Sequence, residues 1–166
     1  MSDSKLAPER NQTAAVHGTF RIERIYRQSP ARVFWAFTEK SMVRRWRVES
    51  EGCEVHEFTY DFRIGGSEVS RFSFAGGPEI RLDAQFQDIV PDRRIVFSYR
   101  MGMEPNPFSV SLTTVELAPS GEGTCLIYTE QGAYFDGGMD SATGREHGCR
   151  ELLEKLATEL EAETPR

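Results

Sequence analysis

The sequence predicts an α+β domain in which a curved, seven-stranded antiparallel sheet is covered by one long C-terminal helix. Three observations lead to this prediction. The chain has 166 residues, the size of one ordinary domain. Apolar and polar residues alternate from Cys53 to Phe135, a period typical of strands with one buried face. After Asp140, apolar residues recur at helical spacing.

One strand and two short helices are expected before the alternating segment. Phe20, Ile22 and Tyr26 alternate with polar residues and predict the strand. Ser29 and Pro30 then supply an N-cap followed by proline at the first helical position. Two helices are expected because apolar residues recur at helical spacing on both sides of a break near Thr38. These apolar residues are Val33, Phe34 and Phe37, then Met42, Val43 and Trp46.

Turn-forming residues divide the alternating segment into six strands. Strands joined by short turns pair with their sequence neighbours, so we expect an antiparallel meander. The five turns are predicted at Gly65-Gly66, Gly76-Gly77-Pro78, Pro91-Asp92-Arg93, Met101 to Pro107, and Pro119 to Gly123.

The last predicted helix begins after an N-cap at Asp140 and runs to about Glu161. A single helix covers the concave face of a curved sheet incompletely, so we expect a cavity beside its N-terminal half. Small residues leave room there, namely Gly144, Gly148 and Cys149. The inward-facing stripe of the helix is predicted to consist of Ala142, Arg145, Cys149, Leu152, Leu156 and Leu160.

Composition narrows the classes of function. Lys and Arg number 20 against 26 Asp and Glu, and a net charge of -6 gives no general attraction to nucleic acid. No apolar run is long enough for a membrane span. Cys53, Cys125 and Cys149 form no CxxC pair, which is typical of reduced thiols in the cytoplasm. We expect a cytoplasmic domain over residues 18–163, preceded by a disordered tail at residues 1–17 that lacks the pattern of a secretory signal.

An ordered series of short motifs resembles a known superfamily. The motifs are Ser29-Pro30-Ala31-Arg32-Val33-Phe34, Trp46, Arg63-Ile64-Gly65-Gly66, Ile89 to Phe97, Thr114 to Leu117, Gly123-Thr124 and Leu152 to Leu156. Together they resemble the START-like helix-grip superfamily (SRPBCC, birch-pollen-allergen-like), in the branch of the activator of heat-shock protein 90 ATPase homologue. The resemblance implies a seven-stranded sheet that grips the C-terminal helix around an apolar cavity. Many relatives carry Gly-Trp in the last helix where this chain has Gly148-Cys149, a difference expected to enlarge the cavity.

The candidate binding site consists of apolar side chains and a few polar ones that share their faces. Polar groups in such positions are costly unless they are paired, so they either form internal ion pairs or orient a ligand. Three tyrosines add hydroxyl groups, and Cys149 is interpreted as a packed thiol rather than an activated one. The polar candidates are Arg24, Glu68, Arg145, Tyr60, Tyr99 and Tyr128. The apolar candidates are Trp46, Phe58, Phe72, Phe74, Phe97 and Leu152.

Arg145 has two possible partners at this point. An internal acid such as Glu68 or Glu130 could pair with it, or an acidic group on the ligand could. We expect the acidic group of the ligand to be the partner of Arg145. His56 lies beside Glu57, but no further metal ligands converge on them by spacing, so neither a metal nor a cofactor is expected.

Three functions follow from the residues and the resemblance together. The first is a binding protein for a small hydrophobic or aromatic molecule. The alternative is a cyclase or dehydratase acting on a polyketide-like or aromatic substrate, in which Glu68 or a tyrosine would perform acid–base chemistry. The second alternative is a chaperone-interacting domain. An exposed edge strand is also compatible with a homodimer.

Overall fold

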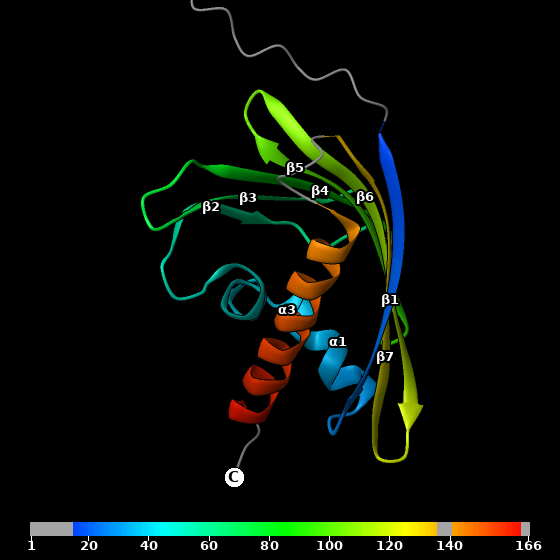
Figure 1. The fold of residues 1–166 in the computed structure, drawn as a ribbon. Coiled ribbons are helices and arrows are strands. Elements are labelled where there is room, and N and C mark those ends of the chain that lie inside the picture. Colours follow the sequence, from blue (N-terminus) through cyan, green and yellow to red (C-terminus); the bar gives the residue numbers. More distant parts are fainter. Residues whose placement is uncertain (1–14, 136–140, 164–166) are drawn as a thin grey trace, which may run out of the picture.

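One seven-stranded antiparallel sheet curls around a long helix, as Figure 1 shows. The computed structural model describes residues 15–135 and 141–163. The strands are β1 (Val16–Tyr26), β2 (Cys53–Tyr60), β3 (Ser67–Phe74), β4 (Ile80–Val90), β5 (Arg94–Met103), β6 (Asn106–Ser120) and β7 (Gly123–Tyr134). The helices are α1 (Pro30–Thr38), α2 (Lys40–Val43), the π-helical turn η1 (Arg44–Val48) and α3 (Ala142–Ala162). The predicted fold class is confirmed.

The strand order is β1-β7-β6-β5-β4-β3-β2. Strands β2 to β7 form the predicted meander, and β1 pairs antiparallel with β7 along its whole length. This strand begins at Val16, so Val16 and His17 belong to the sheet and not to a tail. The remainder of the predicted tail, residues 1–14, lies outside the described residues. The sheet has β1 and β2 at its edges, and a homodimer through either of them stays a prediction.

The two predicted helices after β1 are present, with one change. Ser29 caps α1, since its Oγ accepts a hydrogen bond from the backbone N–H of Arg32 at 3.3 Å. The second predicted helix is split into α2 and η1, where the N–H of Glu49 reaches back to the carbonyl of Arg44 at 2.9 Å. Such i to i+5 turns are rare in proteins overall, and those that occur are often found at functional sites. This wide turn buries Trp46, whose indole N–H donates to the carbonyl of Ala36 at 3.0 Å.

The buried face of α3 differs at two positions from the predicted stripe, since Ala142 and Leu152 are only partly buried. Leu153 is fully buried, whereas Leu152 is only partly buried. The buried residues are Arg145, Cys149, Leu153, Leu156 and Leu160. The helix is capped by Ser141, whose Oγ accepts from the N–H of Gly144 at 3.1 Å. The predicted cap, Asp140, lies outside the described residues.

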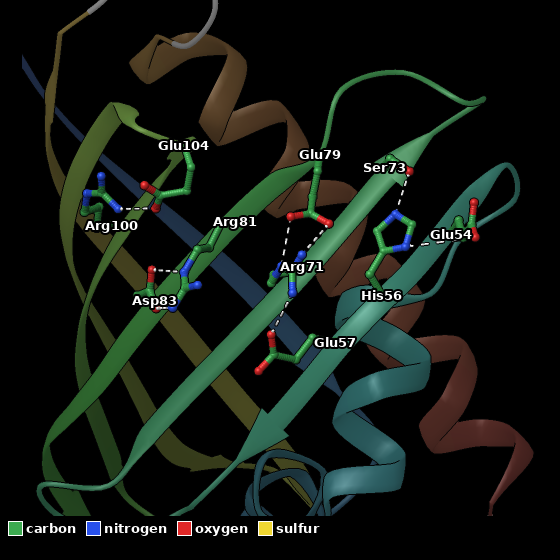
Figure 2. Close-up of polar contacts among 10 residues, drawn as sticks. All are labelled: Glu54, His56, Glu57, Arg71, Ser73, Glu79, Arg81, Asp83, Arg100 and Glu104. Carbon is green, nitrogen blue, oxygen red and sulfur yellow. Dashed lines mark hydrogen bonds and ion pairs between the residues drawn. The ribbon is translucent and has the colours of Figure 1, made fainter.

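The outer face of β2 to β4 carries ion pairs, both between neighbouring segments and along β4, that point away from α3 (Figure 2). Arg71 contacts Glu79 at 2.8 Å and Glu57 at 3.4 Å, and Arg81 contacts Asp83 at 2.8 Å. The hydrogen bonds from the guanidinium groups lower the pKa of Glu79 and of Asp83. Because side chains alternate along a strand, these charges leave the opposite face of β3 free for the cavity described below.

No helix in the described part of the chain is long and apolar enough to cross a membrane. Within residues 15–135 and 141–163, no three His, Cys, Asp or Glu side chains converge as metal ligands would.

Candidate functional site

A cavity of about 470 Å³ lies between the concave face of β3 to β5 and the N-terminal half of α3. The segment from η1 to Ser50 forms a further wall. Exposed lining residues, among them Phe74, Glu49 and Glu151, mark its opening to solvent. The helix contributes small residues here, Gly144, Gly148 and Cys149, so the space is not filled from that side.

One wall of the cavity is apolar. It is built by alternate residues of β3 and their cross-strand neighbours, since Phe72 pairs with Ile80 and Ser70 pairs with Leu82. The rings of Phe72 and Phe74 meet edge to face, with centroids 5.7 Å apart. The apolar lining residues are Phe72, Phe74, Ile80, Leu82, Met101 and Leu152.

A buried ion pair between Arg47 and Glu68 faces the same cavity. Nη1 of Arg47 lies 2.8 Å from Oε2 of Glu68, and the two side chains are 13% and 1% exposed. Ser70 Oγ donates to the other carboxylate oxygen at 3.1 Å. The guanidinium carbon of Arg47 sits 4.9 Å from the ring centroid of Phe97, a cation–π contact. Burial by itself would lower the pKa of Arg47, but the charge of Glu68 and the nearby tyrosine hydroxyls more than offset it and raise this pKa.

Arg145 belongs to a second buried network, centred on Glu130. Nη1 of Arg145 lies 3.1 Å from Oε1 of Glu130, and Nη2 donates to Ser109 Oγ at 2.7 Å. The hydroxyl of Tyr99 donates to Glu130 at 2.7 Å and accepts a hydrogen bond from Arg145. Tyr128 also donates to Glu130, at 3.1 Å. The expectation that an acid on the ligand partners Arg145 is therefore wrong, because Glu130 fills that role.

Cys149 is a packed thiol, as the sequence analysis favoured. Its Sγ lies 3.6 Å from the hydroxyl of Tyr128 and 3.8 Å from Glu130. Burial, and then the charge of Glu130, raise the pKa of Cys149 to about 12, so the thiol stays protonated at neutral pH. Burial also raises the pKa of Tyr99 and of Tyr128, and both hydroxyls remain neutral.

The structure brings most of the predicted site residues together around the cavity. Those that line it are Glu68, Phe72, Phe74, Tyr99, Tyr128, Arg145, Cys149 and Leu152. Trp46 and Phe97 line a neighbouring void of about 20 Å³. This void shares four lining residues with the main cavity, Arg47, Tyr128, Cys149 and Leu152. A void of this size holds about one water molecule.

Three predicted site residues lie elsewhere. Phe58 and Tyr60 lie outside the cavity because the helices after β1 cover the concave face of β2. Their rings stack on each other, with centroids 5.8 Å apart. Lys40 lies 5.8 Å from the ring centroid of Phe58, and the hydroxyl of Tyr60 donates to the carbonyl of Phe37. Arg24 does not line the cavity and instead pairs with Glu154 of α3 at 2.8 Å.

Several lining residues were missed from the sequence, among them Ile80 and Leu82 of the apolar wall, Met101 and Arg47. Met101 was assigned to a turn, but β5 continues to Met103. Arg47 was not considered, because the π-helical turn that aims it at the cavity has no recognised sequence pattern. The available signal was Glu68, since a carboxylate in register with buried aromatic residues requires a cationic partner.

Comparison with known proteins places the chain in a family. Residues 27–161 match the family model described as "Activator of Hsp90 ATPase homolog 1-like protein". The chain belongs to this family. The Hsp90-ATPase-activator-like family is the branch that the motifs indicated, so the predicted resemblance is confirmed. No curated protein matches the chain.

Solved structures of similar proteins share the fold of this member of the Hsp90-ATPase-activator-like family. The Mll3558 protein of Rhizobium loti is 67% identical, with a TM-score of 0.81 over 89% of this chain and 99% of that one. A protein of Rhizobium leguminosarum is 33% identical, with a TM-score of 0.85 over 90% and 98% of the two chains. An AHSA1-like protein of Aeromonas hydrophila, 18% identical with a TM-score of 0.66 over 87% and 93% of the two chains, shares the fold.

Proposed function

We propose that the protein binds a small, largely apolar molecule in the cavity between β3 to β5 and α3. The observation that carries this proposal is the cavity volume of about 470 Å³. Protein interiors are close-packed, and voids much larger than a water molecule are uncommon in them. Small-molecule sites occupy about 300–1,000 Å³ and combine apolar walls with a few fixed polar groups, which is the composition of this lining.

The cyclase or dehydratase alternative has less support. It requires a side chain that exchanges a proton with the substrate. Glu68 is held by Arg47 and Ser70, and the hydroxyls of Tyr99 and Tyr128 donate to Glu130. These contacts stabilise the site in one arrangement, which suits binding better than proton transfer.

A chaperone contact is the second alternative, and it rests on the name of the family alone. Such a contact would use the surface of the protein and would not require a cavity. If the purified protein changed the ATPase rate of Hsp90 and took up no apolar molecule, this alternative would replace the binding proposal.

Titration with the uncharged fluorophore Nile red tests the binding proposal. We expect saturable uptake by the native protein with one probe per chain, and loss of uptake on unfolding in denaturant. Native mass spectrometry of freshly purified protein should show an added small-molecule mass that disappears after delipidation. Fluorescence that rises without saturation would contradict a defined cavity site.

A further inference from the structure

The two buried ion pairs beside the cavity differ in how many of their hydrogen-bonding groups are already used. In the Glu130 network, both carboxylate oxygens accept from Arg145, Tyr99, Tyr128 or Thr113. In the other pair, only Nη1 of Arg47 has a hydrogen-bond partner, the carboxylate of Glu68. Among the described residues, Nε and Nη2 of Arg47 donate no hydrogen bond. A guanidinium carries five N–H donors, so Arg47 keeps several of them for another group.

The position of Arg47 is fixed before any ligand arrives. Glu68 holds one side of the guanidinium, and the ring of Phe97 lies 4.9 Å from its central carbon. Arg47 lines the main cavity and the adjoining small void, so its unused donors are accessible from the cavity. A donor that is already oriented costs little further entropy when an acceptor arrives.

The two guanidinium groups that line the cavity are already paired with carboxylates. The other charged lining residues are Glu49, Glu151 and Lys155, and Lys155 donates to the backbone carbonyl of Glu49. Arg47 is neutralised by Glu68, and Arg145 is neutralised by Glu130. A carboxylate on the ligand would add a second anion beside Glu68, and an ammonium group would add a second cation beside Arg47. Next to Arg47 and Glu68, either group would be buried without a counter-charge of its own, which is costly away from water.

We propose that Arg47 selects an uncharged apolar ligand by donating hydrogen bonds to a carbonyl oxygen of that ligand, such as a ketone, ester or amide. This inference rests on the binding function proposed above. It replaces the expected acidic ligand on Arg145 with a neutral ligand on Arg47. The apolar wall formed by Phe72, Ile80 and Leu82 would hold the remainder of the molecule.

Three matched naphthalene probes at pH 7.5 test the proposal. They are 2-acetylnaphthalene, which has a carbonyl, 2-isopropenylnaphthalene, which replaces that oxygen by CH₂, and 2-naphthoate, which is an anion. Each is measured by displacement of Nile red from the native protein. We expect the ketone to bind about tenfold or more tightly than the alkene, as a hydrogen bond from a charged donor would produce. We expect naphthoate to bind more weakly than the ketone.

Two variants assign the preference to Arg47. Replacing both members of the pair, Arg47→Met with Glu68→Met, avoids stranding one buried charge. In this double variant the ratio of alkene to ketone dissociation constants should fall to about one. The matched control is Arg44→Met, which removes a partly exposed cation of the same π-helical turn, one that pairs with Glu49 at 2.6 Å and does not line the cavity. The control should keep the preference of the unmodified protein.

A measurement on the unmodified protein keeps the proposal testable if the double variant does not fold. The carbonyl stretch of bound, isotope-labelled 2-acetylnaphthalene should shift to lower frequency than in hexane, because a charged N–H donor weakens the C=O bond. An unshifted band, equal binding of ketone and alkene, tightest binding of naphthoate, or an undiminished preference in the double variant would each overturn the role of Arg47. Failure of Nile red and of every naphthalene to bind would instead overturn the binding function itself.

Discussion

The hydroxyl of Tyr26 donates a hydrogen bond to the carbonyl oxygen of Leu153 across 2.9 Å, joining the first strand to the middle of the last helix. Both residues are buried. Burial raises the pKa of Tyr26 to about 12, so the hydroxyl remains a donor at physiological pH. This contact ties α3 to the sheet through two residues that do not themselves line the main cavity.

Replacing Tyr26 by Phe should therefore lower stability without changing binding. We expect a loss of about 1 kcal/mol in the free energy of unfolding, the usual net value of one hydrogen bond. Urea denaturation measures it, and Nile red affinity serves as the control. A change in affinity comparable to the change in stability would show that the contact at the middle of α3 also shapes the cavity.

Arg145→Leu should be strongly destabilising. The substitution leaves the carboxylate of Glu130, which is 0% exposed, without its cation. We expect a loss of about 3–5 kcal/mol in the free energy of unfolding. The double variant Arg145→Leu with Glu130→Leu should recover much of this loss, since no charge is then stranded. If Arg145→Leu were as stable as the unmodified protein, Glu130 would not be its main partner.

Alkaline pH should weaken the fold in part through Cys149. Its thiol has a pKa of about 12 in the folded protein, compared with about 8.5 in an unfolded chain. A raised folded-state pKa stabilises the protein fully below the unfolded value, and this contribution is lost as the pH rises toward 12. Between about pH 8.5 and pH 12, the free energy of unfolding should decline less steeply in Cys149→Ser than in the unmodified protein, by up to about 1.4 kcal/mol per pH unit. An unchanged slope would mean that the thiol titrates alike in both states.

Gly148→Phe should block the cavity. A Cβ atom at Gly148 would meet no atom within 4 Å, so the backbone tolerates a side chain that then occupies the space beside the cavity wall. We expect Nile red affinity to fall about tenfold or more, in line with the loss of buried apolar contact area. His147→Phe, on the exposed side of the same helix, is the matched control and should bind normally. Equal binding by both variants would place the probe elsewhere.

The order of strands and helices could be predicted because each element leaves a local signal. Alternation from Phe20 to Tyr26 and the Ser29-Pro30 start of the first helix are short-range patterns, and the structure reproduces them. The end of β5 and the burial of Leu153 instead of Leu152 were mispredicted. Both features depend on how the bent sheet packs against α3. Neighbouring residues in the sequence carry no information about that packing.

The candidate site was predictable only in part, because its buried charges pair with residues from distant segments of the chain. Glu68 and Arg145 were identified as buried charges from their register, but their partners come from distant segments: Arg47 lies 21 residues before Glu68, and Glu130 lies 15 residues before Arg145. Pairing across such separations is decided by tertiary structure, so register alone leaves internal and ligand partners equally possible.

The place of β1 at the edge of the sheet, beside β7, also sets an order for folding (Figure 1). Strands β2 to β7 each pair with a sequence neighbour, and such hairpins close short loops. Tyr26 pairs with Thr124, almost a hundred residues later, so the pairing of β1 must close a long loop before any of its contacts form. The six-stranded meander can therefore assemble first, and the arrival of β1 completes the sheet. Backbone amides of β5 and β6 should accordingly become protected from hydrogen exchange earlier during refolding than those of β1.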